Sequence, residues 1–450
     1  MADGAAPPVL IRGTPRSRQA HLSGDLLLMA ESAALYALPG AQAAALRAAM
    51  ERGEAAVTAR LAALGLTAAA APALSDDLAD DLSDAAPGPV RALALTVAQG
   101  CNMACGYCYA AGGAFGGAVR QMPPEVARAA IDRLIEAAPP GGAVQIAFMG
   151  GEPWMAKGLI RDAVIHARRR AAARAVRTGF SMTTNATLLR AEDAAFLAEH
   201  RFAVTVSLDG DRAANDRLRP MAGGGGSFDR VAARLGPLLE QADRLRLSAR
   251  VTVTPDNLDI PRTVAALSAL GFDTIGVSPM LASPTGKGAL GAADFPRLLE
   301  AMIAAGEDWL EAIIAGRPHG FANLATALGE LHRGQPRSVS CGAVRDYLAV
   351  DAEGNYAACH RFVNDPLGAM GDLSGGPDAA ARAAFLAERR VEAQPGCAGC
   401  WARRLCGGGC HHEVLHAGRP ACDYVRGWLD YAISAYGRLM AARPDWFGDA

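Results

Sequence analysis

Apolar residues recur along the middle of the chain in short runs, separated by longer amphipathic stretches. The short runs have the length of buried strands, and they occupy residues 92–97, 144–149, 179–184, 202–208, 247–254 and 274–279. Segments with apolar residues at helical spacing alternate with them, at residues 123–138, 157–175, 228–242 and 259–270. This alternation predicts an α/β fold with a parallel sheet, open or curved into a partial (β/α)6 TIM-like barrel.

The beginning of the chain has a different pattern. Residues 26–29 and 34–38 have the character of short strands, and residues 42–52 and 54–64 have apolar positions at helical spacing. We therefore predict a small N-terminal α+β module over residues 1–66. Residues 67–90 are rich in Ala, Pro and Asp, which is the composition of a solvated linker.

The last third of the chain divides again. A helical pattern runs from about residue 295 to 331, whereas residues 341–422 are rich in Gly and Cys and show little periodicity. A segment of that kind needs a covalent or metal scaffold to stay ordered. We predict a barrel over residues 91–290, a helical connector over 291–340 and a Cys-rich domain over 341–450.

Composition narrows the class of protein. At 450 residues the chain exceeds one hydrophobic core, and 51% hydrophobic residues are ample for a packed protein. The net charge of −2 gives no reason to expect a nucleic-acid partner. The sequence has neither a secretory signal pattern nor a long uninterrupted apolar stretch. We therefore expect a cytoplasmic protein without a membrane partner.

The chain has ten cysteines, and they are grouped. None lies in the first hundred residues, and none lies between residues 109 and 340. Because the cytosol keeps thiols reduced, this grouping predicts metal ligation rather than disulfides.

The first group follows the first predicted strand of the barrel and consists of Cys101, Cys105 and Cys108. Three thiolates can bind three irons of a [4Fe-4S] cube and leave the fourth iron open. The alternative is a structural zinc ion, which normally takes four ligands, and no fourth Cys or His lies nearby. Other polar residues also follow predicted strands, at the barrel edge where β/α folds gather function.

With Tyr107 just before its last cysteine, this CxxxCxxC run resembles the signature of the radical S-adenosylmethionine (SAM) superfamily. The resemblance implies that the cluster cleaves SAM and that Tyr107 lies beside the adenine. The Gly150-Gly151-Glu152-Pro153 segment is similar to the motif that binds the amino group of SAM. The resemblance further implies that strand-end residues line the ribose and the carboxylate of SAM, namely Asn185, Ser207 and Asp209, with Arg219 as a further candidate for the carboxylate.

The remaining cysteines resemble those of the SPASM domain, which carries auxiliary iron–sulfur clusters. Cys341 is followed by a Gly-x4-Cys ending at Cys359, then by a CxxCx5Cx3C run and a last cysteine. The resemblance implies two auxiliary [4Fe-4S] clusters, and hence three in all. One would be held by Cys397, Cys400, Cys406 and Cys422. The other would be held by Cys341, Cys359 and Cys410, with its fourth iron open or bound by Asp346.

Sulfatase maturases share this architecture but have an Asp where this chain has His360, which disfavours formylglycine formation. His360 is either a base near neutral pH or a structural histidine. The N-terminal module resembles peptide-recognition domains. With the Cys359-His360-Arg361-Phe362 segment, this makes the chain similar to maturases of the kind that act on quinohemoprotein amine dehydrogenase. That similarity implies thioether cross-links in a Cys-containing peptide or small protein, and an electron donor such as a flavodoxin or ferredoxin.

Other functions stay open. One is a maturase that forms carbon–carbon cross-links or oxidises a single residue. Another, from a different class, is a zinc-stabilised binding scaffold. Metal content separates them, because zinc without sulfide excludes iron–sulfur clusters.

Overall fold

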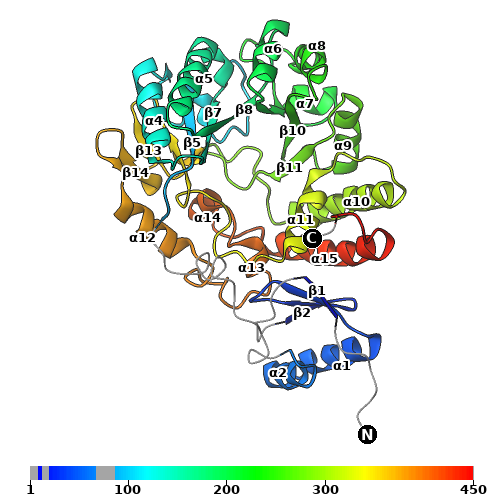
Figure 1. Cartoon of the computed structure of the whole chain (residues 1–450). Coiled ribbons are helices and arrows are strands. Elements are labelled where there is room, and N and C mark those ends of the chain that lie inside the picture. The colour runs from blue at the N-terminus through cyan, green and yellow to red at the C-terminus, as the bar shows by residue number, and fades with distance from the viewer. Residues whose placement is uncertain (1–8, 13–19, 67–86, 449–450) are drawn as a thin grey trace.

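The structure is a computed structural model that describes residues 9–12, 20–66 and 87–448 of the chain. The predicted linker falls almost entirely outside the described residues, including its acidic run at 75–81. The described chain has a large α/β body and a smaller N-terminal module, which lies below it in Figure 1.

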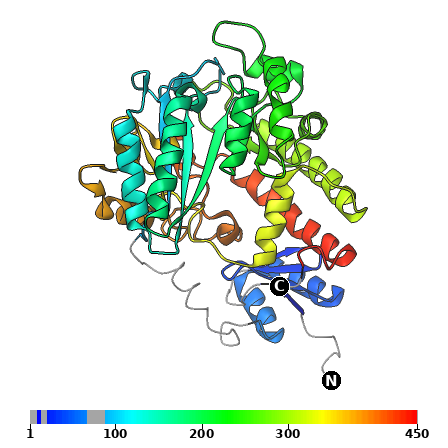
Figure 2. The same ribbon diagram turned by 45° about the horizontal axis from the view of Figure 1, so that its top comes forward.

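Six parallel strands form the sheet of the body, and helices cover its outer face (Figures 1 and 2). The strands are β5 (Ala92–Gln99), β7 (Ala143–Gly150), β8 (Arg177–Thr184), β9 (Ala203–Ser207), β10 (Arg246–Val253) and β11 (Ile275–Pro279). The helices are α4 (Pro124–Ala137), α5 (Lys157–Ala172), α6 (Ala191–Glu199), α7 (Arg212–Leu218), α8 (Phe228–Leu239) and α9 (Ile260–Ala269). The predicted partial barrel is confirmed.

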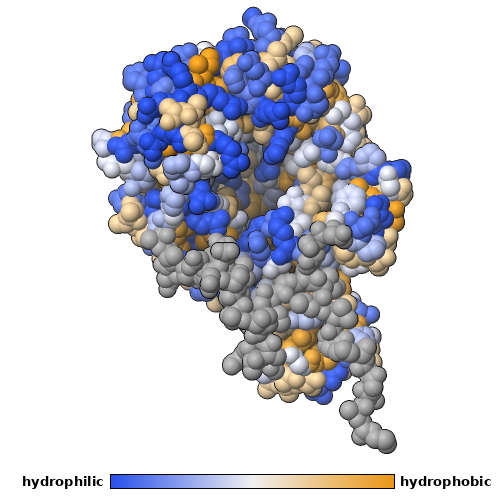
Figure 3. Space-filling model, in the orientation of Figure 1, coloured by the Kyte–Doolittle hydropathy of each residue, from blue (hydrophilic) through white to orange (hydrophobic). Residues whose placement is uncertain are grey.

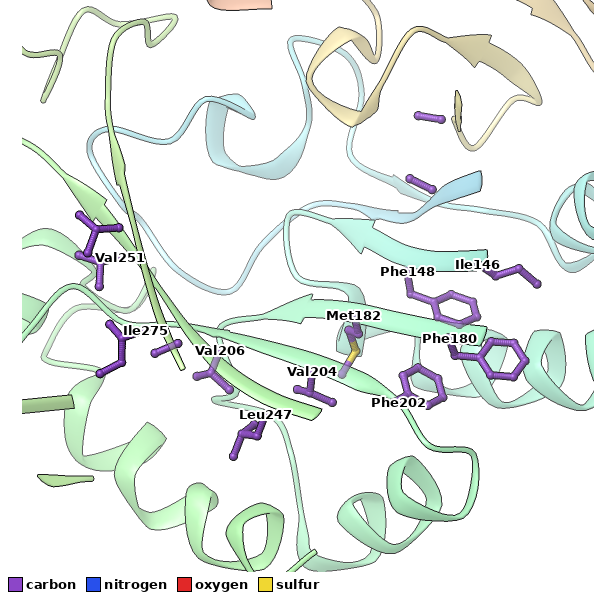
Figure 4. Packing of buried hydrophobic residues seen from close by; sticks show 14 of the residues in the cluster. Ile146, Phe148, Phe180, Met182, Phe202, Val204, Val206, Leu247, Val251 and Ile275 are labelled. Carbon is purple, nitrogen blue, oxygen red and sulfur yellow. The ribbon is translucent and has the colours of Figure 1, made fainter. Parts of the chain in front are cut away.

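The core between the sheet and its helices is built on every second residue of the strands. Phe148, Phe180 and Phe202 are almost fully buried and stack on one another, with ring centroids 5.5 to 6.5 Å apart (Figure 4). Burying each such side chain contributes about 1.5–3 kcal/mol. These rings tie three neighbouring strands together.

The opposite face of the sheet is polar. Along β10, Leu247, Ala249, Val251 and Val253 are buried against the helices, so the alternation turns Ser248, Arg250 and Thr252 to the other side. We call this side the inner face. By the same alternation it also carries Ser181, Thr183, Thr205, Ser207 and Ser278. Apart from Arg250, these side chains are small.

The sheet continues into the Cys-rich part of the chain. Strand β12 (Tyr347–Val350) pairs in parallel with β5. Strands β13 (Asn355–Ala357), β14 (Ala369–Asp372) and β15 (Gly376–Pro377) follow in antiparallel order, and β6 (Arg120–Gln121) pairs with the end of β5. Residues 341–422, which show little periodicity in the sequence, therefore contain several short strands. These strands are only two to four residues long, which is too short for a periodic pattern.

Helices fill the rest of the C-terminal half. The predicted connector consists of α10 (Asp294–Ile314) and α11 (Ala322–Arg333). Beyond it lie α12 (Ala379–Arg389), α13 (Arg403–Cys406), α14 (His411–Ala417) and the long α15 (Cys422–Ala442). None of the helices in the described part of the chain has the length and apolar character that crossing a membrane requires.

The N-terminal module has its own four-stranded antiparallel sheet, in the order β1-β4-β3-β2. Its strands are β1 (Val9–Arg12), β2 (Ala20–Ser23), β3 (Leu26–Met29) and β4 (Ala34–Ala37), and its helices are α1 (Gly40–Glu51) and α2 (Glu54–Ala63). A separate hydrophobic core holds it together, including Leu27, Tyr36, Leu46 and Leu61. The predicted strands and helices of this module are confirmed.

The module packs against the C-terminal region. His21 stacks on Trp401 at 3.6 Å, and its Nε2 lies 2.7 Å from a carboxylate oxygen of Asp430 on α15. Glu31 forms ion pairs with Arg403 and Arg404 of α13. The module is thereby attached beside the Cys-rich region.

Candidate active site

The first cysteine loop follows β5 and is fixed by hydrogen bonds with the segments that follow β8 and α7. Nδ2 of Asn185, just after β8, donates to Oδ1 of Asn102 at 2.9 Å, and Nδ2 of Asn102 donates to Oγ1 of Thr187 at 2.8 Å. The backbone N–H of Ala104 donates to the carbonyl of Pro220 at 2.9 Å. The loop therefore has one defined conformation.

The three thiols of this loop lie near one another. Burial raises the pKa of Cys101 to about 11, and the nearby Cys105 and Cys108 add to the rise. Burial also raises the pKa of Cys105. Such thiols become ligands when a bound metal draws off their protons, as coordinating thiols do. Nδ2 of Asn185 lies 3.8 Å from the sulfur of Cys101, where it can donate to a thiolate. The donor set fits three irons of a cluster.

Glycines let three backbone segments pack beneath the loop. A Cβ on Gly151 would lie 2.3 Å from the carbonyl oxygen of Gly100, and one on Gly150 would lie 2.3 Å from that of Ala98. Gly113 has a φ of +97°, and a Cβ there would lie 2.7 Å from Cα of Gly151. Gly150 and Gly151 thus allow close backbone packing, which sets the position of Glu152. Their contact with SAM stays a prediction.

Glu152 is completely buried at the end of β7. Its Oε1 accepts hydrogen bonds from the N–H of Trp154 at 2.9 Å and from the hydroxyl of Thr184 at 2.7 Å. Its Oε2 accepts one from the N–H of Asn185 at 2.7 Å. Burial raises the pKa of Glu152 although these donors oppose the rise. Oε2 has a second lone pair for a cation such as an ammonium group.

Tyr107, Asp209 and Arg219 form one buried group. Nη1 of Arg219 donates to the hydroxyl of Tyr107 at 2.5 Å, and that hydroxyl donates to Oδ2 of Asp209. Nη1 of Arg219 lies 3.7 Å from the same carboxylate oxygen. Burial raises the pKa of Tyr107 well above its ordinary value, so its hydroxyl stays protonated. The three candidates for SAM contact are therefore bonded to each other, while Ser207 lies near them at the end of β9.

A second thiol group lies in the Cys-rich region and consists of Cys341, Cys359 and Cys410. Burial raises the pKa of Cys359 to about 12, and the nearby Cys410 and Cys341 add to the rise. Nη1 of Arg361 lies 3.7 Å from the sulfur of Cys410 and 2.8 Å from Oε1 of Glu413. Asp346 lies near Cys341, since a Cβ on Gly342 would be 2.4 Å from its Oδ1. Its role as a ligand or in catalysis stays a prediction.

A third thiol group collects the remaining cysteines. Burial raises the pKa of Cys397 and of Cys406, and the charge of Cys422 adds to both. Cys400 acts on Cys397 in the same way. Although Cys410 follows Cys406 by only four residues, Cys410 belongs to the second group. The sets into which the structure brings these thiols are those implied by the SPASM resemblance.

The spacing of the sulfurs bears on the metal. In the described part of the chain, no three cysteine sulfurs lie within 4.8 Å of one another. Around a tetrahedral zinc ion the sulfurs would be about 3.8 Å apart, given a Zn–S bond of about 2.3 Å. As they stand, the thiols are therefore farther apart than the ligands of one zinc ion. This spacing favours a larger, sulfide-bridged cluster over the zinc-stabilised scaffold.

Tyr109 lies between the first and second thiol groups, a contact that the sequence did not reveal. Both Cys108 and Cys359 raise the pKa of its phenol, although burial is the larger cause. Its ring packs edge-on against His360 at 5.9 Å, and the guanidinium of Arg361 lies 5.2 Å from its centroid. This aromatic contact joins the loop of Cys108 to the segment of Cys359.

His360 itself is a hydrogen-bonded side chain. Its Nδ1 lies 3.1 Å from the hydroxyl of Tyr347. Burial lowers the pKa of His360 to about 4, and the charge of Arg361 contributes. The imidazole is therefore neutral at pH 7, and the structure does not support the expectation of a base that titrates near neutral pH. The alternative of a structural histidine fits these contacts.

Arg250 is a further residue that sequence reasoning missed. It belongs to the inner face, and its guanidinium donates to the hydroxyl of Ser278. Burial lowers the pKa of Arg250, and Arg361 contributes as a like charge, while Glu413 is the acidic group that opposes the shift. Because Glu413 is already paired with Arg361, Arg250 places a positive charge on the inner face.

Comparison with known proteins decides the family. The model of the radical SAM superfamily matches residues 95–236, which include the first cysteine loop, Glu152 and the Tyr107 partners. Residues 95–236 are a radical SAM domain. The protein is therefore a radical SAM enzyme, whose family chemistry uses SAM and a [4Fe-4S] cluster.

Individual relatives cover more of the chain. A serine-type anaerobic sulfatase-maturating enzyme from Klebsiella aerogenes is 26% identical over 362 residues, covering 76% of this chain and 85% of the relative. Among solved structures, native anSMEcpe with bound AdoMet and a bound peptide matches with a TM-score of 0.66 at 19% identity, covering 79% of this chain and 99% of that one. SuiB from Streptococcus suis matches with a TM-score of 0.52 at 16% identity, covering 89% and 96%. The radical SAM enzyme shares its fold with both.

Proposed function

We propose that this radical SAM enzyme is a maturase that installs intra-chain thioether cross-links, from Cys sulfur to carbon, in a ribosomally made polypeptide. The small subunit of quinohemoprotein amine dehydrogenase is a candidate substrate. When bound, SAM and the cluster at Cys101, Cys105 and Cys108 supply a 5′-deoxyadenosyl radical that removes a hydrogen atom from the substrate. The chain's own residues position this chemistry. Glu152 holds the ammonium group of SAM, while Asn185, Ser207 and Asp209 lie at neighbouring strand ends and Arg219 lies at the end of α7.

The observation that carries the proposal is Tyr109. It follows Cys108 of the first thiol group directly in the chain, and its ring packs against His360, which follows Cys359 of the second. The second group has three cysteines, so a cluster there keeps one iron for a substrate thiolate unless Asp346 fills the position. A thiolate held at that place would lie next to the loop where hydrogen is removed. Sulfur and carbon of one substrate would then meet in one site.

Two further features support a polypeptide substrate. The inner face of β8 to β11 carries small polar side chains together with Arg250, and Figure 3 shows this side of the molecule hollowed near its centre. The related solved structure of anSMEcpe contains a bound peptide. The N-terminal module, with its short antiparallel strands, supplies a place to hold a second part of the substrate.

The proposal includes two auxiliary clusters, a donor such as a flavodoxin or ferredoxin, and a cytoplasmic location. All ten cysteines are free, which suits a reducing compartment. Anaerobically reconstituted enzyme is expected to contain about twelve irons and about twelve sulfides. Replacing Cys101, Cys105 and Cys108 by Ala should remove about four irons and abolish SAM cleavage. Replacing Cys341, Cys359 and Cys410 by Ala should remove about four others and leave SAM cleavage in place.

Mass spectrometry of a co-expressed Cys-containing peptide tests the product. The expected result is a loss of two hydrogens per cross-link, with thiols that no longer react with iodoacetamide. A peptide that loses hydrogens while all its thiols remain alkylatable would refute the thioether. That outcome would favour a carbon–carbon cross-link or oxidation of a single residue. The likeness to sulfatase-maturating enzymes favours the last of these, and His360 in place of Asp disfavours it.

A further inference from the structure

A cluster of metal-ligating side chains that contains no cysteine lies close in the chain to Cys359 and Cys410 of the second thiol group. It consists of Asp365, His412 and His416, and one ligand atom of each lies within 4.8 Å of the others. Among the described residues, no other group of three or more such side chains meets this spacing. Nothing in the proposed radical chemistry uses it.

Local structure fixes all three side chains. His412 and His416 are four residues apart on α14, so they share one face of the helix, and their ring centroids are 4.4 Å apart. Oδ1 of Asp365 accepts the N–H of Leu367 at 3.0 Å, which turns Oδ2 toward Nε2 of His416 at 2.7 Å. The carboxylate is therefore held by its own turn while its other oxygen faces the histidines.

The hydrogen bond between His416 and Asp365 does not account for the position of His412. Its Nδ1 is buried and has no hydrogen-bond partner. A buried ring nitrogen without a partner is unfavourable, because it has lost its hydrogen bond to water. The ring packs edge-on against Phe362 at 5.0 Å, which holds it beside His416. A simple His416–Asp365 pair would not require this second imidazole.

The donor set and the charge suit a transition cation. Two imidazoles and one carboxylate are the ligands of many three-ligand zinc sites, in which water takes the fourth position. Ligand atoms of a tetrahedral zinc ion lie about 3.3 Å apart, so small side-chain rotations would close this group around one ion. Arg361, the nearby cation, is already paired with Glu413 at 2.8 Å. The side chain of His416 is 37% exposed, which gives an ion access.

We propose that Asp365, His412 and His416 bind one divalent cation of the zinc type, separate from the thiol groups. Asp365 follows Cys359 by six residues, and His412 follows Cys410 by two. The ion therefore joins the two chain segments that carry these cysteines and holds them at a fixed spacing. This role does not depend on the thioether proposal, since it concerns the scaffold of the second thiol group.

Zinc stoichiometry of the cluster-loaded enzyme tests the site. Full-length protein without a histidine tag is reconstituted with iron and sulfide, freed of loosely bound metal by a chelator, and dialysed against zinc. Mass spectrometry of metals should find about one zinc per chain, and about none in His416→Gln, with iron and sulfide unchanged. The matched control is His166→Gln, which removes a histidine paired with Asp132 at 2.8 Å but without a second imidazole, and it should keep the zinc.

The atoms that bind the zinc show whether it occupies this site or a cysteine group. X-ray absorption at the zinc edge should show nitrogen and oxygen neighbours only. Sulfur neighbours, or an equal zinc content in His416→Gln, would overturn the site. His412→Ala removes the buried ligand and should also lose the zinc. If that variant loses iron as well, the zinc content of His416→Gln, whose side chain is more exposed, still decides whether the site exists. A further expected result is slower release of iron to a chelator when zinc is bound, in the wild type but not in His416→Gln.

Discussion

The guanidinium of Arg219 donates a hydrogen bond of 2.5 Å to the hydroxyl of Tyr107. In the sequence, Tyr107 stands between Cys105 and Cys108 of the first cysteine loop. The same hydroxyl donates to Asp209, and all three side chains are at least nine-tenths buried. The bond fixes the cysteine loop to the end of α7, whereas Asn102 fixes it to the segment after β8. The loop is thus held from two directions.

Removing the hydroxyl tests this bond. Tyr107→Phe leaves Arg219 and Asp209 3.7 Å apart without their bridging group, which should cost about 1–3 kcal/mol of stability. Asp209→Asn leaves the guanidinium buried without its counter-charge and should cost about 3–5 kcal/mol. The control is Tyr36→Phe, because the hydroxyl of Tyr36 is buried without a partner and its loss should be neutral. Thermal midpoints of the apo proteins give the comparison, and equal midpoints for Tyr107→Phe and Tyr36→Phe would contradict it.

Glu152→Gln should weaken SAM binding. The carboxylate receives only donors, from Trp154, Thr184 and Asn185, so the NH2 of a glutamine would face an N–H or O–H. Loss of a hydrogen bond to a charged group costs about 1.5–3 kcal/mol, or roughly a tenfold to hundredfold rise in Kd. Equilibrium dialysis with labelled SAM measures it. Glu125→Gln on α4 is the control, and an unchanged Kd at full iron content would show that Glu152 does not hold SAM.

Arg250→Gln should separate SAM cleavage from product formation. If the inner face receives the substrate, its guanidinium is the positive charge that a carboxylate of the polypeptide would meet. The variant should then cleave SAM with little cross-linked product, while Arg250→Lys recovers part of the yield. Arg246→Gln lies at the exposed start of the same strand and serves as the control. Product yield equal to the wild type in Arg250→Gln would exclude the role.

His411→Phe should reduce the loss of stability in mild acid. Both ring nitrogens of His411 are buried without partners, and burial lowers its pKa to about 4 from 6.5. As pH falls from 6.5, the unfolded chain takes up a proton that the folded chain refuses, so the free energy of unfolding falls. Phenylalanine cannot take up this proton. It keeps an aromatic ring beside Phe385, whose centroid lies 5.6 Å from that of His411 in the wild type.

Thermal midpoints measured at about pH 7.5 and pH 5.5 show the effect, because histidine charges within this range when it is exposed. The difference between the two midpoints should be smaller in His411→Phe than in the wild type, and His166→Gln provides the comparison for a histidine that has a hydrogen-bond partner. An equal difference in all three proteins would contradict the prediction.

Local patterns in the sequence were sufficient for the barrel. Apolar residues recur with the period of a strand or a helix along its six strands and most of the helices between them. Cys101, Glu152, Asn185 and Asp209 follow strand ends as predicted. The contacts missed are those between distant segments. Tyr109 meets His360, and Arg250 shares the inner face with Ser278, because of pairings that no local pattern encodes.

In the Cys-rich region too, the sequence predicted some features and not others. Its cysteine spacing matched a known pattern, so the thiol groups were anticipated, whereas its strands were not. The titration of His360 depends on burial and on Arg361, which one sequence does not reveal. The cluster of Asp365, His412 and His416 also required the fold, because the carboxylate lies far from the histidines along the chain.

The pairing of β12 with β5 has a mechanical consequence. Strand β12 pairs with β5 on one side and with β13 on the other, so the strand that leads to Cys101 and the strand that leads to Cys359 belong to one sheet, with β12 between them. Two bodies joined by a hinge could change their separation, whereas neighbouring strands in a sheet keep a spacing of about 4.8 Å. The sheet therefore fixes the distance between the first and second thiol groups. Any polypeptide that reaches both has to match a length set by the enzyme's main chain.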